Sequence, residues 1–95
     1  MEPTPAFVYI VRCADGTLYT GWTYDVTRRV AMHNAGRGAA YTRQRGPVTL
    51  VYHETQPDRS AALRREEEIK RKGRAYKERL MRQGMAGEEL RVENE

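Results

Sequence analysis

Residues 7–23, FVYIVRCADGTLYTGWT, predict a β-hairpin on which the rest of the fold is built. Segment 7–13 is almost continuously β-branched and aromatic, which is typical of a strand buried on both faces. Ala14-Asp15-Gly16 has turn chemistry, because a glycine can adopt the positive φ that a tight turn requires. Residues 17–23 then complete the hairpin as its second strand.

The length of the turn decides whether Tyr9 and Tyr19 can cooperate. A two-residue turn at Asp15-Gly16 would place the two tyrosines on opposite faces of the hairpin. A three-residue loop with a bulge at Gly16 would pair Tyr9 with Gly21 and bring both tyrosines to one face. We favour this second register, in which Gly21 leaves open space beside the Tyr9 ring for a substrate.

The remainder of the chain predicts one more strand and three helices. The predicted elements are a helix capped by Asp25 or Thr27 and ending near Asn34, a loop rich in glycine and arginine over 35–46, a strand over 48–54, and helices over 60–72 and 74–83 that Gly73 separates. The order ββαβαα predicts an α/β (α+β) domain in which a three-stranded antiparallel sheet is flanked by helices.

A chain of 95 residues has the length of one domain. We expect a flexible lead-in over residues 1–6, a single domain over 7–83 and an acidic flexible tail over 84–95. Cys13 is the only cysteine, so no internal disulfide can form. The sequence has no secretory segment and no apolar stretch of about 18 residues, so we expect a cytoplasmic protein without a membrane partner.

Positive charge is concentrated in two parts of the chain, whose net charge is +4. Segment 26–53 has five arginines and no acidic residue, and segment 59–82 has ten Lys/Arg against four Glu. Such blocks on a folded protein are typical of a polyanion-binding surface, although Lys and Arg can also simply solvate helix faces. We expect DNA as the partner, with RNA as the other possibility, and contacts from Gly21, Arg28, Arg37, Tyr41, Arg43 and Arg45.

Arg29 and His33 are four residues apart, so the first helix places them on one face. Arginine has the fork geometry that fits phosphate oxygens, and histidine can transfer a proton near neutral pH. Tyrosine by itself is a poor base, with a pKa of about 10. Tyr9 becomes a plausible base only if a nearby cation or metal stabilises its phenolate.

Glu66 is the acidic residue that needs an explanation. Helical spacing in AALRREEEIK, residues 61–70, places Ala62, Leu63, Glu66 and Ile69 on one side of the helix. A carboxylate on an inward face is costly unless it is paired or binds a metal. The pattern leaves both possibilities open, a metal ligand or a salt bridge to one of the many arginines.

These residues together resemble the GIY-YIG nuclease domain. The matching positions are Val8-Tyr9-Ile10 and Tyr19-Thr20-Gly21, followed by Thr23, Arg29, His33 and Glu66. Both tripeptides depart from the literal family letters, at Val8 and at Thr20, but they keep the two tyrosines and the second glycine. The segment GWTYDVTRRVAMHN and the loop GRGAAYT are similar to those of small stand-alone bacterial members of the family, and the resemblance covers about residues 7–80.

The resemblance implies hydrolysis of a phosphodiester with one divalent metal ion, Mg²⁺ or Mn²⁺, bound by Glu66. Tyr9 would act as general base, and Tyr19 and His33 would orient the attacking water or tune Tyr9. Arg29 would neutralise charge on the phosphate in the transition state. Many members also have an asparagine soon after the metal-binding glutamate, whereas the first asparagine after Glu66 here is Asn94.

The sequence therefore predicts an endonuclease of low sequence specificity, acting on single-stranded, branched or damaged DNA, as a monomer or weak homodimer. The alternatives are a non-catalytic nucleic-acid-binding module and an accessory that docks onto a repair protein. Several side chains are more typical of packing or loop structure than of chemistry: Tyr24, Tyr41, Tyr52, Tyr76, Trp22 and His53, and the loop glycines Gly36, Gly38 and Gly46.

Overall fold

The computed structural model describes residues 4–86 of the chain; residues 1–3 of the expected lead-in and 87–95 of the expected tail lie outside this range. Its elements are β1 (Ala6–Arg12), β2 (Leu18–Thr23), α1 (Val26–Asn34), α2 (Ala40–Arg43), β3 (Thr49–Gln56), α3 (Arg59–Lys72) and α4 (Arg74–Ala86). The α+β class and the order ββαβαα are confirmed, with the short helix α2 as an addition.

The three strands form one antiparallel sheet in the order β2-β1-β3. Tyr9 is paired with Gly21 and Val11 with Tyr19, so the register with the three-residue loop is confirmed. The loop closes through a 2.8 Å hydrogen bond from the backbone N–H of Cys13 to the carbonyl of Thr17. Gly16 has a φ of 88°, the left-handed conformation that the bulged turn requires.

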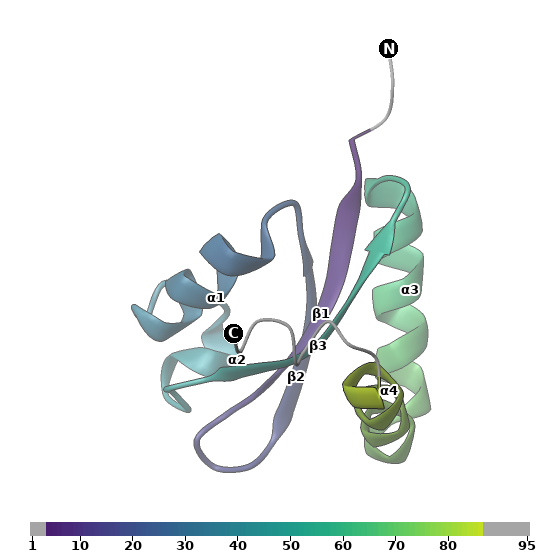
Figure 1. Ribbon diagram of the computed structural model, residues 1–95. Coiled ribbons are helices and arrows are strands. Elements are labelled where there is room, and N and C mark those ends of the chain that lie inside the picture. Colours follow the sequence, from purple (N-terminus) through teal and green to yellow (C-terminus); the bar gives the residue numbers. More distant parts are fainter. Residues whose placement is uncertain (1–3, 87–95) are drawn as a thin grey trace.

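The sheet is the middle layer of the domain, with α1 and α2 on one face and α3 and α4 on the other (Figure 1). Strand β1 is buried from both sides, as its continuous apolar run predicts. Val8 and Ile10 pack with residues of α3 and α4, whereas Tyr9 and Val11 belong to a second cluster on the α1 side. The site residues of β1 are thus fixed in the centre of the molecule by burial of both faces.

Short polar caps determine where α1 begins and ends. The Asp25 carboxylate accepts a 3.0 Å hydrogen bond from the backbone N–H of Arg28, so Asp25 is the N-cap. At the other end, Asn34 exchanges two hydrogen bonds with the backbone of Val48, at 2.6 and 3.2 Å. This amide pair ties the end of α1 to the start of β3 and sets how α1 lies over the sheet.

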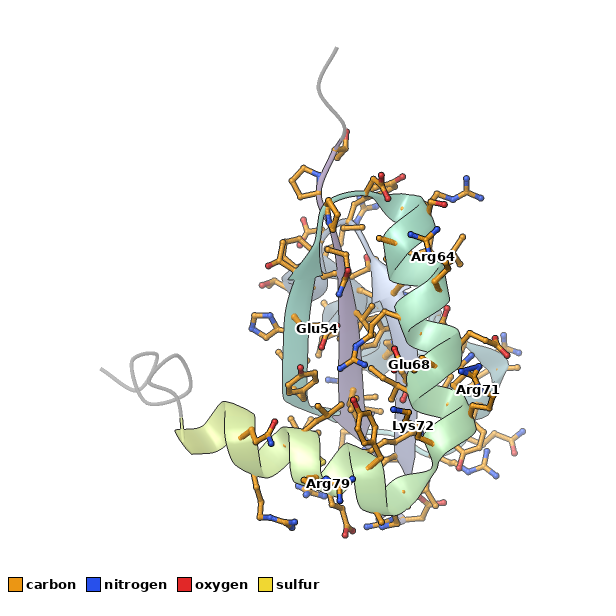
Figure 2. The ribbon with its side chains drawn as sticks, turned by 90° about the vertical axis from the view of Figure 1, so that its right-hand side faces the viewer. Glu54, Arg64, Glu68, Arg71, Lys72 and Arg79 are labelled. Atoms are coloured by element: carbon orange, nitrogen blue, oxygen red, sulfur yellow. The ribbon has the colours of Figure 1, made fainter. Side chains whose placement is uncertain are left out.

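Helix α3 departs from the predicted packing at one position. Ala62 and Ile69 are fully buried, but Leu63, expected on the same face, is 38% exposed. Arg65 turns inward in its place and forms ion pairs with Glu54 of β3 at 2.7 Å and with Glu68 at 3.0 Å. Figure 2 shows Glu54 on the strand beside α3. Because an arginine can bury its stem while its guanidinium is fully paired, it takes the place expected for the leucine.

Hydrogen bonding makes the Arg65 site a closed polar network. The hydroxyl of Tyr52 donates to Glu54, and burial together with that carboxylate raises the pKa of Tyr52 to about 12. Burial alone would raise the pKa of Glu54, but its bonds to Arg65 and Tyr52 outweigh this and lower it. The Glu54 carboxylate and the Arg65 guanidinium therefore both stay charged between α3 and the sheet at neutral pH.

Helix α4 continues to Ala86, three residues beyond the predicted end at 83, and crosses near the end of α3 (Figure 2). Gly84 does not stop it, because the missing side chain allows close packing: a Cβ at Gly84 would lie 3.2 Å from Cδ1 of Tyr52. Within residues 4–86, none of the helices has the length and apolar character needed to cross a membrane.

Candidate active site

The centre of the candidate site is a buried contact between Tyr9 of β1 and His33 of α1. Both residues are 1% exposed, and a 2.8 Å hydrogen bond joins the Tyr9 hydroxyl to Nε2 of His33. A Cβ at Gly21 would lie 2.6 Å from the Tyr9 hydroxyl oxygen. The space beside Tyr9 that we expected to be open to substrate is therefore filled by the phenol itself, and Gly21 is required for this packing.

Tyr19 continues the site on the neighbouring strand. Its ring meets His33 edge-on with the centroids 5.5 Å apart, and stacks on Tyr41 of α2 at 5.8 Å and an interplanar angle of 21°. Tyr41 is 38% exposed and carries the guanidinium of Arg45 4.0 Å above its ring. An aromatic wall thus leads from the buried histidine to the surface.

His33 is held from its other side by α2 and by the loop before it. Its Nδ1 is 2.7 Å from the hydroxyl oxygen of Thr42, which is fully buried. Gly38 lies directly against the imidazole, since a Cβ there would be 2.7 Å from Cγ of His33. Neither Thr42 nor Gly38 was predicted to have this role, because a four-residue helix and a glycine-rich loop carry no periodic signal.

Burial sets the charge state of the pair. Burial raises the pKa of Tyr9, with the charge of Glu66 adding to the effect, and the adjacent Arg29 only partly offsets it. Burial also lowers the pKa of His33, and the positive charge of Arg29 lowers it further. At neutral pH the two groups are therefore a neutral phenol and a neutral imidazole.

Arg29 and Glu66 approach this pair from opposite layers of the fold, α1 and α3. Glu66 has a side chain 15% exposed and forms an ion pair with Lys70 at 3.1 Å. The salt bridge foreseen for Glu66 therefore exists, with a lysine instead of an arginine. Its carboxylate still has the ligand chemistry of Mg²⁺, which is commonly held by one carboxylate together with water and substrate phosphate.

No group of three or more His, Cys, Asp or Glu side chains within residues 4–86 could form a protein-only metal cage. Glu66 is the carboxylate whose charge acts on Tyr9, and it is the candidate donor at this site. This arrangement fits a hard cation that keeps most of its own water, and it does not fit a tightly enclosed Zn²⁺ site, which needs three or four protein ligands.

The residues expected to contact nucleic acid differ in their availability. Arg28, Arg37 and Arg43 are exposed, and Arg28 and Arg29 line a groove of about 240 Å³ between the end of β2 and α1. Arg45 is instead engaged within the protein, with Asp15 at 3.3 Å and the Tyr41 carbonyl at 2.8 Å. These contacts close α2 onto the hairpin turn, and a phosphate would have to compete with Asp15 for the half-exposed Arg45 guanidinium.

A profile described as the GIY-YIG catalytic domain matches residues 5–79, and the chain belongs to this family, a nuclease-type family. The chain is similar to UPF0213 proteins: it is 59% identical over 75 residues to one from Natronomonas pharaonis, covering 79% of this chain and 88% of that protein. One from Staphylococcus epidermidis is 54% identical over 78 residues, covering 82% and 95%. The solution NMR structure of a UPF0213 protein from Bacillus halodurans has 47% identity and a TM-score of 0.51, covering 80% and 81%.

Proposed function

We propose that the protein is a metal-dependent endonuclease that hydrolyses phosphodiester bonds in DNA. The observation that carries the proposal is the buried hydrogen bond between Tyr9 and His33, with Tyr19, Arg29 and Glu66 around it. A pure binding module has no use for a buried proton-transfer pair beside an arginine and a carboxylate. Membership of a nuclease-type family supports the same conclusion.

Each side chain has a distinct role in this proposal. Tyr9 accepts the proton of the attacking water, and Tyr19 helps to orient that water. Arg29 neutralises charge that develops on the phosphate oxygens. Glu66 holds the divalent ion, Mg²⁺ or Mn²⁺, and such an ion when bound supplies stabilisation of the leaving 3′ oxygen.

The charged surface supports a nucleic-acid substrate. Figure 2 labels Arg64, Arg71, Lys72 and Arg79 on α3 and α4, in addition to the exposed arginines on the α1 side. These groups act on the phosphate backbone, which carries no sequence information, so low sequence specificity follows. The proposed substrate is single-stranded, branched or damaged DNA. We propose that the protein acts in the cytoplasm as a monomer or weak homodimer, with or without a repair protein as partner.

The decisive experiment measures cleavage of single-stranded, duplex and branched DNA and of RNA, with Mg²⁺, Mn²⁺ or a chelator. We expect metal-dependent cleavage of DNA that is reduced by about 10²-fold or more in Tyr9→Phe and Glu66→Gln, since each removes a group acting on the transition state. Glu67→Gln is the matched control for Glu66→Gln, because Glu67 is an exposed glutamate on the same helix.

A second function, binding without cleavage, makes the opposite prediction. In that case all substrates stay intact in the presence of either metal while salt-sensitive binding persists. Cleavage by Glu66→Gln at the parent rate would show that Glu66 is not the metal ligand. Equal cleavage of RNA would overturn the assignment of DNA as the substrate.

A further inference from the structure

The proton on His33 can be located from the buried atoms around it. The imidazole ring makes two hydrogen bonds, one to Tyr9 through Nε2 and one to Thr42 through Nδ1. A neutral imidazole donates through one nitrogen and accepts through the other. The direction of the bond to Thr42 therefore fixes the direction of the bond to Tyr9.

Thr42 has only one hydroxyl proton, and the structure shows where it goes. Its hydroxyl oxygen lies 3.0 Å from the backbone carbonyl oxygen of Ala39. A carbonyl can only accept, so Thr42 must donate to Ala39 and present a lone pair to His33. The opposite arrangement would bury two oxygen lone pairs against each other and leave the Ala39 contact repulsive.

We propose that Thr42 is a positioning residue that holds His33 as the Nδ1–H tautomer, so that Nε2 accepts the proton of the Tyr9 hydroxyl. The proposal rests on the nuclease function proposed above. The chain of donors then runs from Tyr9 to His33, from His33 to Thr42 and from Thr42 to the Ala39 carbonyl. The Tyr9 oxygen then has a lone pair available to accept a proton, with the side chain of Arg29 beside it.

This order of donors gives Tyr9 a group to which it can pass its own proton, which a phenol needs in order to act as a base. The buried phenol is protonated at neutral pH, so it can take a proton from water only by releasing its own. As the water oxygen bonds to phosphorus, its proton passes to Tyr9 and the phenol proton passes to Nε2, giving an imidazolium that donates at both nitrogens. The 3′ oxyanion leaves and takes a proton from solvent, and the imidazolium returns its proton to Tyr9 as Tyr9 releases the proton that it took from the water.

Two hydrogen-bond acceptors stabilise this transient cation against the positive charge of Arg29. Arg29 from α1 opposes the imidazolium, whereas Thr42 accepts its Nδ1–H and Tyr9 can accept from Nε2. Tyr19 faces the ring edge-on from β2, and Glu66 contributes negative charge near Tyr9 from α3. Loss of the Thr42 hydroxyl would leave the Nδ1–H unpaired in a buried site and favour the other tautomer, whose Nε2–H blocks proton transfer from Tyr9.

The test reads the tautomer directly in the ligand-free protein. The chain has two histidines, so ¹H–¹⁵N long-range NMR spectra of the full chain contain two ring patterns, and His53→Gln assigns them. We expect a protonated Nδ1 and an unprotonated Nε2 for His33. A protonated Nε2 in the unchanged protein overturns the proposal without any variant.

Two substitutions then test the role of the hydroxyl. Thr42→Val should shift His33 toward the Nε2–H form, and Thr42→Ser should restore the Nδ1–H form. In cleavage assays we expect Thr42→Val to lower kcat by at least about tenfold with KM little changed, since acid–base transfer contributes roughly 10²–10⁴-fold, and Thr42→Ser to recover most of it. A pure Nδ1–H form in Thr42→Val would refute the positioning role.

The NMR and kinetic results separate this inference from the proposed function. The expected tautomer and its loss in Thr42→Val, without cleavage in any protein, would support the positioning role and reject the nuclease. Cleavage that is unaffected by Thr42→Val, in a protein whose folding by urea titration is intact, would keep the nuclease and reject the relay.

Discussion

Gly21→Ala is the most direct perturbation of the candidate site, because it adds one methyl group at a place with no room for it. The new Cβ would lie 2.6 Å from the hydroxyl oxygen and 2.8 Å from Cζ of Tyr9, and 3.2 Å from Cε2 of Tyr19. An ordinary contact begins at 3.4 Å. The Tyr9 hydroxyl must therefore move by about 0.8 Å, the difference between 3.4 and 2.6 Å.

That displacement has a cost in stability and a larger cost in activity. Overpacking a buried site typically costs about 1–3 kcal/mol, and the gain from replacing a strand glycine by alanine offsets about 0.5–1 kcal/mol of it. We expect a net loss of about 1–2 kcal/mol. A shift of the hydroxyl by this amount away from Gly21 would change the geometry of its 2.8 Å bond to His33. A misplacement of about 1 Å can cost roughly 10²-fold in rate.

Urea titration and cleavage assays measure the two effects separately. Gly46→Ala is the matched control, because a Cβ at Gly46 meets only the Thr42 carbonyl at 3.9 Å, and we expect it to change stability by less than about 0.5 kcal/mol. A Gly21→Ala protein with the stability and cleavage rate of the parent would refute the packing argument. Loss of stability without loss of cleavage would instead show that the position of the Tyr9 hydroxyl is not used in the reaction.

Three further predictions concern other buried groups. Thr20→Val should raise the free energy of unfolding by about 1 kcal/mol, because the Thr20 hydroxyl is the one buried side-chain polar atom within residues 4–86 without a hydrogen-bond partner. A lower stability of this variant in urea titrations would show that the Thr20 hydroxyl does have a partner. Arg65→Ala should lower the free energy of unfolding, measured by the same method, by about 2–3 kcal/mol. This is less than the roughly 3–5 kcal/mol of a fully buried pair, because the Arg65 and Glu54 side chains are still 20% and 17% exposed. A loss below about 1 kcal/mol would contradict a buried pair. The lowered pKa of His33 means that the unfolded chain binds its proton more readily, so stability should fall as the pH drops below about 6.5, the value of an unperturbed histidine. His33→Gln should flatten the curve below about pH 6.5, and an unchanged slope would contradict the buried neutral imidazole.

Local chemistry in the sequence was sufficient to predict the order of the three strands and three of the four helices, and to favour the hairpin register that the structure shows. The register follows from one glycine that takes a positive φ and from the number of residues in the turn, both of which act within a few positions of each other. The cap at Asp25 likewise bonds to a backbone N–H group three residues ahead. Interactions of such short range are encoded in adjacent letters, so they can be inferred without the tertiary structure.

Some predictions failed where a side chain's surroundings come from another element. Leu63 is exposed although it was expected on the inward face, and Arg65 turns inward because Glu54, eleven residues earlier in the chain, lies across from it. Gly84 continues α4 instead of ending it because Tyr52 packs against it. In both helices the deciding contact comes from β3, through Glu54 for α3 and through Tyr52 for α4, and helix propensity alone does not predict it.

The sequence by itself determined the order of the main elements and the set of residue types that resembles a nuclease family, and it favoured the pairing of Tyr9 with Gly21 that the structure shows. The tertiary structure alone decided that Tyr9 meets His33, 24 positions away, and that Thr42 lies on the other side of the ring. The physical reason is that such contacts depend on the angle at which α1 and α2 lie on the sheet. That angle is set jointly by the Asn34 bonds to Val48, by packing around Val11 and by the absence of a side chain at Gly38.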